Sequence, residues 1–396
     1  MQSDLIPSLH PTPSPQTVED KLAWIRLLRS RRVGVTTFFR LMNEHGSAQA
    51  ALEALPEVAR VAGVKDYAPC PLAVAEAEYE RAQMAGAKMV AWGTKAYPEL
   101  LSEIPDPPPF FWTIGDQALL HSPMVALIGA RNASSIGTRM ARKLAGELSD
   151  AGFTVVSGLA RGIDTVAHTE ALARGKTVAV LAGGVDVIYP KENTVLAEEI
   201  ARDGLRLSEQ PIGLSPQARH FPRRNRLISG LARAVVVVEA AAKSGSLLTA
   251  RNALDQGRDV LAVPGHPFDA RATGCNFLIR DGAALVRGAD DVIEAIGPAR
   301  TAANGLPDDA NSPVSDVCVD DIPPAPPEKR TLAETAQLHR HILSRLGPSP
   351  LAEDQLIRDM GDQHGARSQD ILPELVTLEL EGRITRQPGG LLSKPN

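Results

Sequence analysis

The sequence predicts an α/β protein in which a doubly wound, mainly parallel sheet forms the core, with a small helical domain before it and a winged helix after it. Three observations support this prediction. From residue 123 onward, short apolar runs alternate with helical patterns, which is typical of βαβ units. Residues 17–95 carry mainly helical patterns. Residues 331–396 carry three helical patterns followed by a hairpin pattern.

Length and composition allow more than one domain. The chain has 396 residues, of which 43% are hydrophobic, and this is sufficient for several cores. No apolar run approaches the ~18 residues of a membrane span, and the N-terminus lacks an export-signal pattern, so we expect a cytoplasmic protein. The three cysteines show no C-x-x-C spacing, so we expect reduced thiols, no metal site and no cofactor.

The N-terminal part is expected to be a helical domain behind a disordered tail. Residues 1–16 contain four prolines and little apolar material, which is typical of disorder. Residues 17–95 are expected to form short helices of a helix-hairpin-helix or SAM-like domain, because LPEVARVAGV resembles half of such a unit. This domain is acidic, so we favour contact with an unknown partner over direct DNA contact. Residues 96–122 are expected to be a proline-rich connection.

The core is expected to span residues 123–298. Its predicted strands read VALIG, VVSG, VAVLAGG, RLSE, VVVVEA, LAVPG and ALV. Polar or glycine-rich turns follow most of these strands. The carboxyl ends of parallel strands meet at one edge of a sheet, where open α/β sheets bind ligands. The turns therefore predict one site that is assembled from several loops.

The C-terminal part is expected to be a winged helix behind an acidic linker. Residues 299–330 are rich in proline and aspartate, which is typical of an extended linker. Residues 331–396 are expected to form three helices and a hairpin. The expected recognition helix over 368–381 has four acidic residues and no lysine or arginine. We favour a protein contact for it, because duplex reading needs cations against phosphates.

The charge distribution indicates that the core binds a polyanion. The net charge of the chain is −5, but residues 123–298 hold 21 basic and 18 acidic side chains, a balance of +3. Four arginines and His220 fall within residues 219–226, with no acid among them. A buried strand pattern over 234–238 follows, and then the polar segment 243–246. Two cation-bearing helix starts thus flank one strand, and the free N–H groups of helix starts attract anions.

The predicted phosphate-binding groove draws on all these turns. Its expected cations are Arg131, Arg161, Lys191, Arg223, Arg224 and Lys243. The other expected contacts are Ser134, Asn193, Phe221, Asn225, Arg226, Ser244, Gly245 and Ser246. Phe221 and Tyr189 border cations and could stack on bases or belong to the core, and with aromatic residues at 4% a stacking platform is disfavoured. We expect sequence-tolerant binding of single strands over duplex.

Three enzyme-like interpretations compete with this one. A dinucleotide site needs G-x-G-x-x-G and an acid after the second strand, whereas this chain has GARNASSIG and a second strand ending in Ser-Gly. Asp164 and His168 are expected to share a helix face. They are either an acid–base pair or an acid near a helix start with a histidine one turn further on, and we favour the second interpretation. Glu239 is either a catalytic carboxylate or a buried acid that loop amides bond.

Five long blocks between residues 125 and 291 carry a family resemblance. They read ALIGARNASSIG, SGLARGIDTVAH, AVLAGGVDVIYPKEN, FPRRNRLISGLARAVVVVEAAAKSGSLLTA and AVPGHPFDARATGCNFLIRDGA. In this order they resemble the DprA family (DNA-processing protein A, also called Smf). The helical domain before them and the winged helix after them fit the three-part architecture of many relatives.

The resemblance implies a Rossmann-like core and a recombination mediator, not an enzyme. It implies binding of single-stranded DNA, protection of incoming strands during natural transformation, loading of RecA, and a homodimer formed through the core. Matched by motif, Arg131 and Lys191 line the DNA pocket, and the Phe-Pro-x-Arg-Asn-Arg block adds phosphate contacts. Ala130 departs from the serine that relatives usually carry there. Single-strand-binding protein or another protein is the expected partner of the winged helix.

The alternative reading is a Rossmann-like enzyme of the nucleotide phosphoribohydrolase type. Such enzymes resemble one another through a Pro-Gly-Gly-x-Gly-Thr block followed by a glutamate. The corresponding strand end in this chain reads EAAAKSGSLLTA, which disfavours the alternative.

Overall fold

The computed structural model describes most of the chain. The described residues are 14–64, 66–299, 332–346, 351–364, 371, 374–375, 378–379, 383–387 and 391–394. They fall into two compact units, one within residues 1–55 and 68–308 and the other within 56–67 and 309–396, and each unit is considered by itself. Most of the expected N-terminal tail, almost all of the expected acidic linker and most of the expected helix over 368–381 lie outside the described residues.

Short helices form the N-terminal part, as the sequence predicts. They are α1 (Val18–Arg29), α2 (Val35–His45), α3 (Ala48–Val61) and α4 (Leu72–Met84). A capping box starts α1, because the Thr17 side chain accepts from the Asp20 amide while the Asp20 carboxylate accepts from the Thr17 amide. Trp24 and Phe38 are buried and meet edge to face at 5.0 Å between ring centroids.

A buried carboxylate joins these helices to the sheet. Glu78 in α4 is 3% exposed and accepts from Arg29 Nε and Nη2 of α1 at 3.0 and 2.9 Å. It also accepts from the indole Nε1 of Trp112 at 3.0 Å. Trp112 lies in β2 (Phe110–Gly115), which pairs antiparallel with β1 (Lys88–Ala91) and with β6. The sheet therefore begins well before residue 123, and the expected proline-rich connection contains one of its strands.

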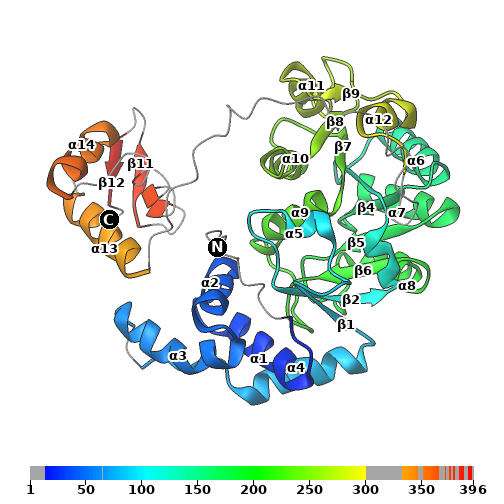
Figure 1. Cartoon of the computed structure of the whole chain (residues 1–396). Coiled ribbons are helices and arrows are strands. Elements are labelled where there is room, and N and C mark those ends of the chain that lie inside the picture. The colour runs from blue at the N-terminus through cyan, green and yellow to red at the C-terminus, as the bar shows by residue number, and fades with distance from the viewer. Residues whose placement is uncertain are drawn as a thin grey trace, which may run out of the picture. The chain divides into compact units, whose positions relative to one another are not determined.

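The core is a nine-stranded sheet in the order β1-β2-β6-β5-β4-β3-β7-β8-β9 (Figure 1). The strands after β2 run parallel to one another, as the sequence predicts. They are β3 (Met124–Gly129), β4 (Thr154–Ser157), β5 (Thr177–Val180), β6 (Leu205–Ser208), β7 (Ala234–Glu239), β8 (Asp259–Ala262) and β9 (Ala284–Leu285). β3 lies between β4 and β7, so the strand order reverses between β3 and β7, which makes this the topological switch point.

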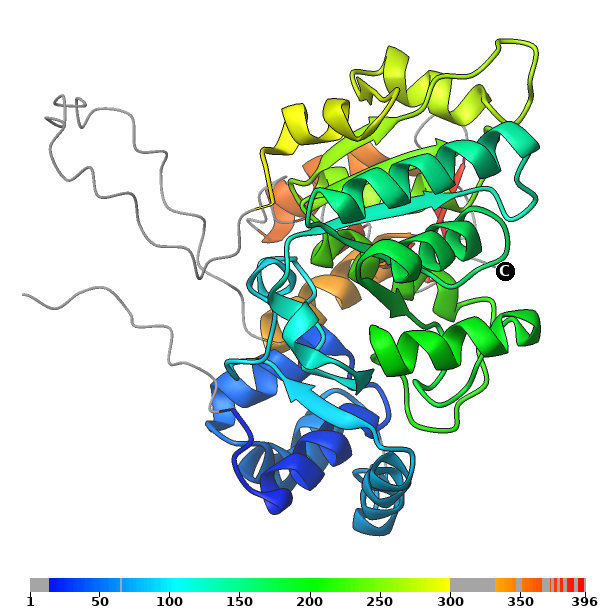
Figure 2. The same ribbon diagram turned by 90° about the vertical axis from the view of Figure 1, so that its right-hand side faces the viewer.

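Helices cover both faces of the sheet, so its strands are apolar on both sides. Val125 and Leu127 of β3 pack with α6 (Ser135–Asp150), α7 (Ile163–Arg174) and α12 (Ala289–Ile296). Ala126 and Ile128 face α9 (His220–Leu231), α10 (Ser246–Asp255) and α11 (Thr273–Arg280). The remaining helical pieces are α5 (Glu99–Ser102), η1 (Gln117–His121), η2 (Lys191–Asn193) and α8 (Thr194–Asp203). Figure 2 shows α6 and α7, in blue-green, in front of the sheet.

The second unit contains a small antiparallel sheet and two described helices. They are α13 (Leu332–Arg345), β10 (Leu351–Ala352), α14 (Glu353–His364), β11 (Thr385–Gln387) and β12 (Leu391–Ser393). The sheet order is β10-β12-β11, and β11 with β12 forms the hairpin that the sequence predicts. Ile342, Leu356, Met360 and Leu392 are among its buried core residues. In neither unit is any described helix long and apolar enough to cross a bilayer.

Candidate nucleic-acid interface

A groove of about 580 Å³ opens at the switch point of the sheet. The loop after β3 and the loop after β7 form its walls, and the first turns of α9 and α10 complete it. Of the expected contacts, it brings together Arg131, Phe221, Arg224, Asn225, Lys243, Ser244, Gly245 and Ser246. Eight of the predicted contacts, which come from separate turns, therefore line one groove at one edge of the sheet.

Exposed cations and two aromatic rings line the mouth of the groove. Arg131 and Lys243 are exposed, one on the loop after each strand. The Arg131 guanidinium lies 5.3 Å from the centroid of the Phe221 ring, a cation–π contact. Phe221 in turn meets Tyr189 edge to face at 5.9 Å. A small side pocket of about 70 Å³ lies between these groups and Arg161.

Arg161 and Lys191 lie beside this side pocket. Arg161 Nε forms an ion pair with Glu192 Oε1 at 2.5 Å, and both side chains are at least half exposed. Lys191 is exposed at the start of η2, but it lines neither hollow. The structure therefore places the two cations near the rings, with Arg161 already facing a carboxylate.

The start of α10 lines the groove. Its N-cap residue, Gly245, has no side chain, but the Ser246 amide donates to Ser244 Oγ at 3.4 Å. The Leu247 and Leu248 amides donate to the carbonyls of Ser244 and Gly245. The hydroxyl groups of Ser244 and Ser246 are 2.7 Å apart and can turn toward an incoming group. Because the first amides of a helix carry a partial positive charge, this helix start can hold a phosphate.

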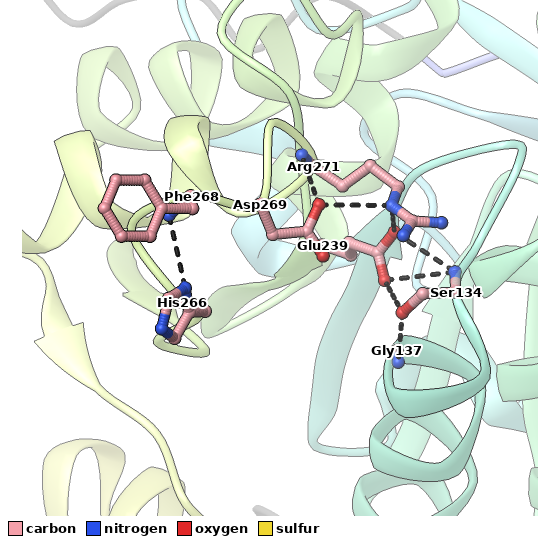
Figure 3. A network of polar contacts seen from close by, with 7 residues as sticks. All are labelled: Ser134, Gly137, Glu239, His266, Phe268, Asp269 and Arg271. Atoms are coloured by element: carbon pink, nitrogen blue, oxygen red, sulfur yellow. Dashed lines mark hydrogen bonds and ion pairs between the residues drawn. The ribbon is translucent and has the colours of Figure 1, made fainter.

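The start of α6, by contrast, already holds an anion of the protein. Glu239, at the end of β7, is 7% exposed, and its carboxylate accepts from the Ser134 hydroxyl at 2.6 Å and the Ser134 amide at 3.2 Å (Figure 3). The Ser134 hydroxyl also accepts from the Gly137 amide at 2.9 Å. A side chain on Gly137 would overlap the Glu239 carboxylate. Glu239 is thus an acid bonded to a loop amide, and the expected DNA contact Ser134 is engaged inside the protein.

Arg224 lies beneath the groove floor and differs from the exposed phosphate contact that the sequence suggested. It is 5% exposed, and Nη1 donates at 2.6 Å to the carbonyl oxygens of both Gly158 and Val180. A side chain on Gly158 would collide with this guanidinium. Burial lowers the pKa of Arg224 to about 10, an effect that the nearby Asp164 opposes, so the group stays charged at neutral pH.

Asp164 and His168 support the same turn from below. Asp164 accepts from the amides of Gly158 and Ala160 at 3.1 and 3.3 Å, and its burial raises its pKa. His168 Nε2 accepts from the Leu159 amide at 3.3 Å. Nδ1 must donate to Thr177 Oγ1 at 2.7 Å, because that hydroxyl donates to another carbonyl. Burial lowers the pKa of His168 to about 3, so it is neutral. Asp164 lies in the first turn of α7, as the favoured interpretation expected, and the structure adds that the pair orders the preceding loop.

The remaining expected contacts lie away from the groove. Arg226 is 7% exposed and forms ion pairs with Glu209 at 2.5 Å and Asp106 at 3.0 Å. Arg223 is exposed but lines a separate hollow of about 410 Å³ together with Asp106 and other side chains. Asn193 is buried, and its amide donates to the carbonyl of Leu159, whose φ of 54° is left-handed. Asn193 thus braces the turn after β4.

Two exposed polar residues of the groove were not predicted from the sequence. Asn132 directly follows Arg131, and Arg271 enters from the loop between β8 and α11. The loop that carries Arg271 follows the carboxyl end of a parallel strand, and this position is the signal that could have identified it.

Comparison with known proteins places all three parts of the chain. Residues 88–297 match the family model described as DNA recombination-mediator protein A. Residues 18–81 match the DprA-like N-terminal HHH domain, and residues 324–390 match the DprA winged helix domain. The first two matches fit the helical domain and the sheet, and the third agrees with the winged helix that the sequence predicts.

Individual relatives agree with these matches. Protein Smf of Synechocystis sp. is 37% identical over 308 residues, which cover 74% of this chain and 76% of that protein. DNA processing protein DprA of Bacillus subtilis is 43% identical over 213 residues, covering 53% of this chain and 72% of that protein. The X-ray structure of DNA processing protein A from Streptococcus pneumoniae superimposes with a TM-score of 0.59 at 36% identity, covering 69% of this chain and 98% of that one.

Proposed function

The chain belongs to the DNA recombination-mediator protein A (DprA) family, and we propose that it binds single-stranded DNA in the groove at the switch point of its sheet. One observation carries the proposal. Arg131 and Lys243, on loops more than a hundred residues apart, line one groove that also includes the start of α10. A backbone with repeated charges fits such a groove, because each phosphate can meet a cation or the positive end of a helix.

The roles of the expected contacts divide by exposure. We assign phosphate contacts to Arg131 and Lys243, with Ser244, Gly245 and Ser246 at the helix start. Arg161, Lys191 and Arg223 extend the cationic surface beyond the groove. Phe221 and Tyr189 offer ring faces to a base that is not paired in a duplex, which favours single strands. Arg224, Arg226, Ser134 and Asn193 act from below by holding the loops in place.

We propose that the protein is not an enzyme. Asp164 lines the groove and Glu239 lies beside it, and both acids already accept hydrogen bonds from the protein. Asp164 accepts from two loop amides, and Glu239 accepts from Ser134. The phosphoribohydrolase alternative predicts release of a free base from nucleoside monophosphates. We expect no release, and detection of free base by chromatography would favour the enzyme.

Binding measurements test the proposed groove. The protein should bind a fluorescent oligothymidylate more tightly than a duplex of the same length. The double variant Arg131→Ala, Lys243→Ala should bind weakly, and the slope of log K against log salt should shrink by about 1.4, since each single-strand phosphate contact contributes about 0.7. An unchanged affinity and slope would show that the strand lies elsewhere.

The cellular role that we propose is that of a cytoplasmic mediator in natural transformation. It protects incoming strands and, as a homodimer, loads RecA, while the winged helix contacts single-strand-binding protein or another protein. RecA filament formation on strands coated with single-strand-binding protein tests this role. The protein should shorten the lag of filament formation, and no effect over a range of doses would argue against mediation.

A further inference from the structure

The anion-binding position at the start of α6 is filled by Glu239, and this arrangement involves a cation of the groove. Figure 3 shows the Glu239 carboxylate between Ser134 and Arg271. The Ser134 amide and hydroxyl hold one side of the carboxylate. Helix starts attract anions, so Glu239 takes the place that a ligand phosphate would otherwise fill. A phosphate in the groove therefore has to find its partners beside Glu239.

Arg271 is one such partner, and its present contacts are weak. Its Nε lies 3.8 Å from Glu239 Oε1, beyond hydrogen-bond distance, and donates to Asp269 Oδ1 at 3.3 Å at an exposed site. The side chain is 46% exposed and lines the groove together with Arg131 and Lys243. A half-exposed ion pair at this distance is weak, whereas a phosphate offers short, charge-assisted hydrogen bonds. Arg271 can therefore exchange a carboxylate for a phosphate at little cost.

The loop that carries Arg271 keeps its shape by other contacts. Asn276 exchanges two hydrogen bonds with the backbone of Gly265, at 3.0 and 3.1 Å. The Asp269 amide donates to the His266 carbonyl at 2.9 Å, and the Arg271 amide donates to Asp269 Oδ1 at 3.0 Å. These contacts do not use the Arg271 guanidinium. The Arg271 side chain is therefore free to move without unfolding its loop.

We propose that Arg271 is a further phosphate-binding residue of the groove, and that Glu239, together with Asp269 of its own loop, is an internal anion that faces it when the groove is empty. This inference rests on the proposed function, because it names one more contact of the same strand. DNA binding would then replace the Arg271–Glu239 pair with an Arg271–phosphate pair. Glu239 stays in place throughout, since Ser134 binds it independently of Arg271.

A double-mutant cycle with oligothymidylate tests the exchange. Arg271→Ala should weaken binding about tenfold and reduce the salt slope by about 0.7, as for one phosphate contact. Glu239→Gln removes the competing charge and should tighten binding several-fold. In the combined variant this gain should vanish, because the released arginine is no longer present. Arg280→Ala is the matched control: Arg280 is an exposed arginine of α11 that pairs with Asp281 and does not line the groove.

The outcomes separate this inference from the proposed function. If the unmodified protein binds the oligonucleotide but Arg271→Ala leaves affinity and salt slope unchanged, Arg271 is not a contact. If Glu239→Gln still tightens DNA binding in the Arg271→Ala background, the Glu239 charge affects binding only by repelling the phosphates. The proposed exchange is then refuted. Should Glu239→Gln fail to fold, Arg271→Lys decides, because it should keep the slope that Arg271→Ala loses. Absence of binding by the unmodified protein overturns the proposed function, and this role with it.

Discussion

Two arginines of α9 are buried, two cations on the loops after β3 and β7 are exposed, and the two pairs play different roles. Arg224 and Arg226 are at least nine-tenths buried and satisfy carbonyl oxygens and carboxylates of the protein. Arg131 and Lys243 are exposed and line the groove. Arg224 therefore supports the groove from below, and the exposed pair determines what the groove attracts. A count of arginines in a sequence does not distinguish the two.

The largest effect that this comparison predicts is on folding. Arg224→Ala leaves two carbonyl oxygens without their buried donor and removes the cation near Asp164, which should cost about 3–5 kcal/mol of the free energy of unfolding. Urea unfolding measures the loss. Arg224→Lys should not restore stability, because a lysine is a point charge without the planar fork of arginine. Rescue of both stability and binding by lysine would show that only the charge of Arg224 matters.

A pH dependence should follow from the same buried layer. The folded-state pKa of His168 is lowered by burial from 6.5 to about 3, so the unfolded chain binds its proton more readily. The stability that neutral His168 provides is complete above about pH 6.5 and is lost as the pH falls toward 3, by about 1.4 kcal/mol per pH unit. Denaturation of His168→Gln across this range should show a shallower dependence. An identical pH profile would contradict the assignment.

Substitution of an exposed cation at the mouth of the groove is expected to affect DNA binding rather than stability. Arg131→Ala should weaken oligothymidylate binding by about 1.5–3 kcal/mol, the range of a hydrogen bond to a charged group, and reduce the salt slope by about 0.7. The free energy of unfolding should change by no more than about 0.5 kcal/mol, since the side chain is exposed. If Arg131→Ala bound oligothymidylate normally but lowered the free energy of unfolding, the proposed division of roles would be wrong.

The smallest effect is expected at Arg223, which is a neighbour of Arg224 on α9. It is exposed and faces a hollow that also contains Asp106 and Asp255, whose charges offset its own. Arg223→Ala should therefore weaken binding by about 1 kcal/mol or less and leave unfolding unchanged. A loss of binding affinity as large as that of Arg131→Ala would indicate that the bound DNA strand continues into this second hollow.

The sheet and its switch point were predictable from sequence because apolar runs and turns follow simple periods. The predicted strands coincide with β3 to β9. The two strands before residue 123 were not found, because β1 directly follows the helices of the expected helical domain and β2 follows a run of prolines. Both strands pair antiparallel at the edge of the sheet and lie outside the βαβ alternation from which the other strands were predicted.

The roles of the arginines on α9 were less predictable, although the sequence held a signal. Arg224 lies three, four and seven residues before Leu227, Ile228 and Leu231, which places it on the buried face of the helix. Charge clustering alone suggested an exposed group. What the sequence cannot supply is the location of the carbonyl oxygens of Gly158 and Val180, which make burial of Arg224 possible. Such partners come from other strands of the sheet.

The shared carboxylate of Glu78 has a practical meaning for dissecting this protein. A fragment that starts at the sheet, at residue 88 or later, would lose both the Glu78 carboxylate that accepts from the indole N–H of Trp112 and the Tyr79 ring that packs on this tryptophan. The helices before it would keep Arg29 but lose the strand that Glu78 docks against. The helical segment and the sheet are therefore expected to fold stably only when both are present in the expressed protein.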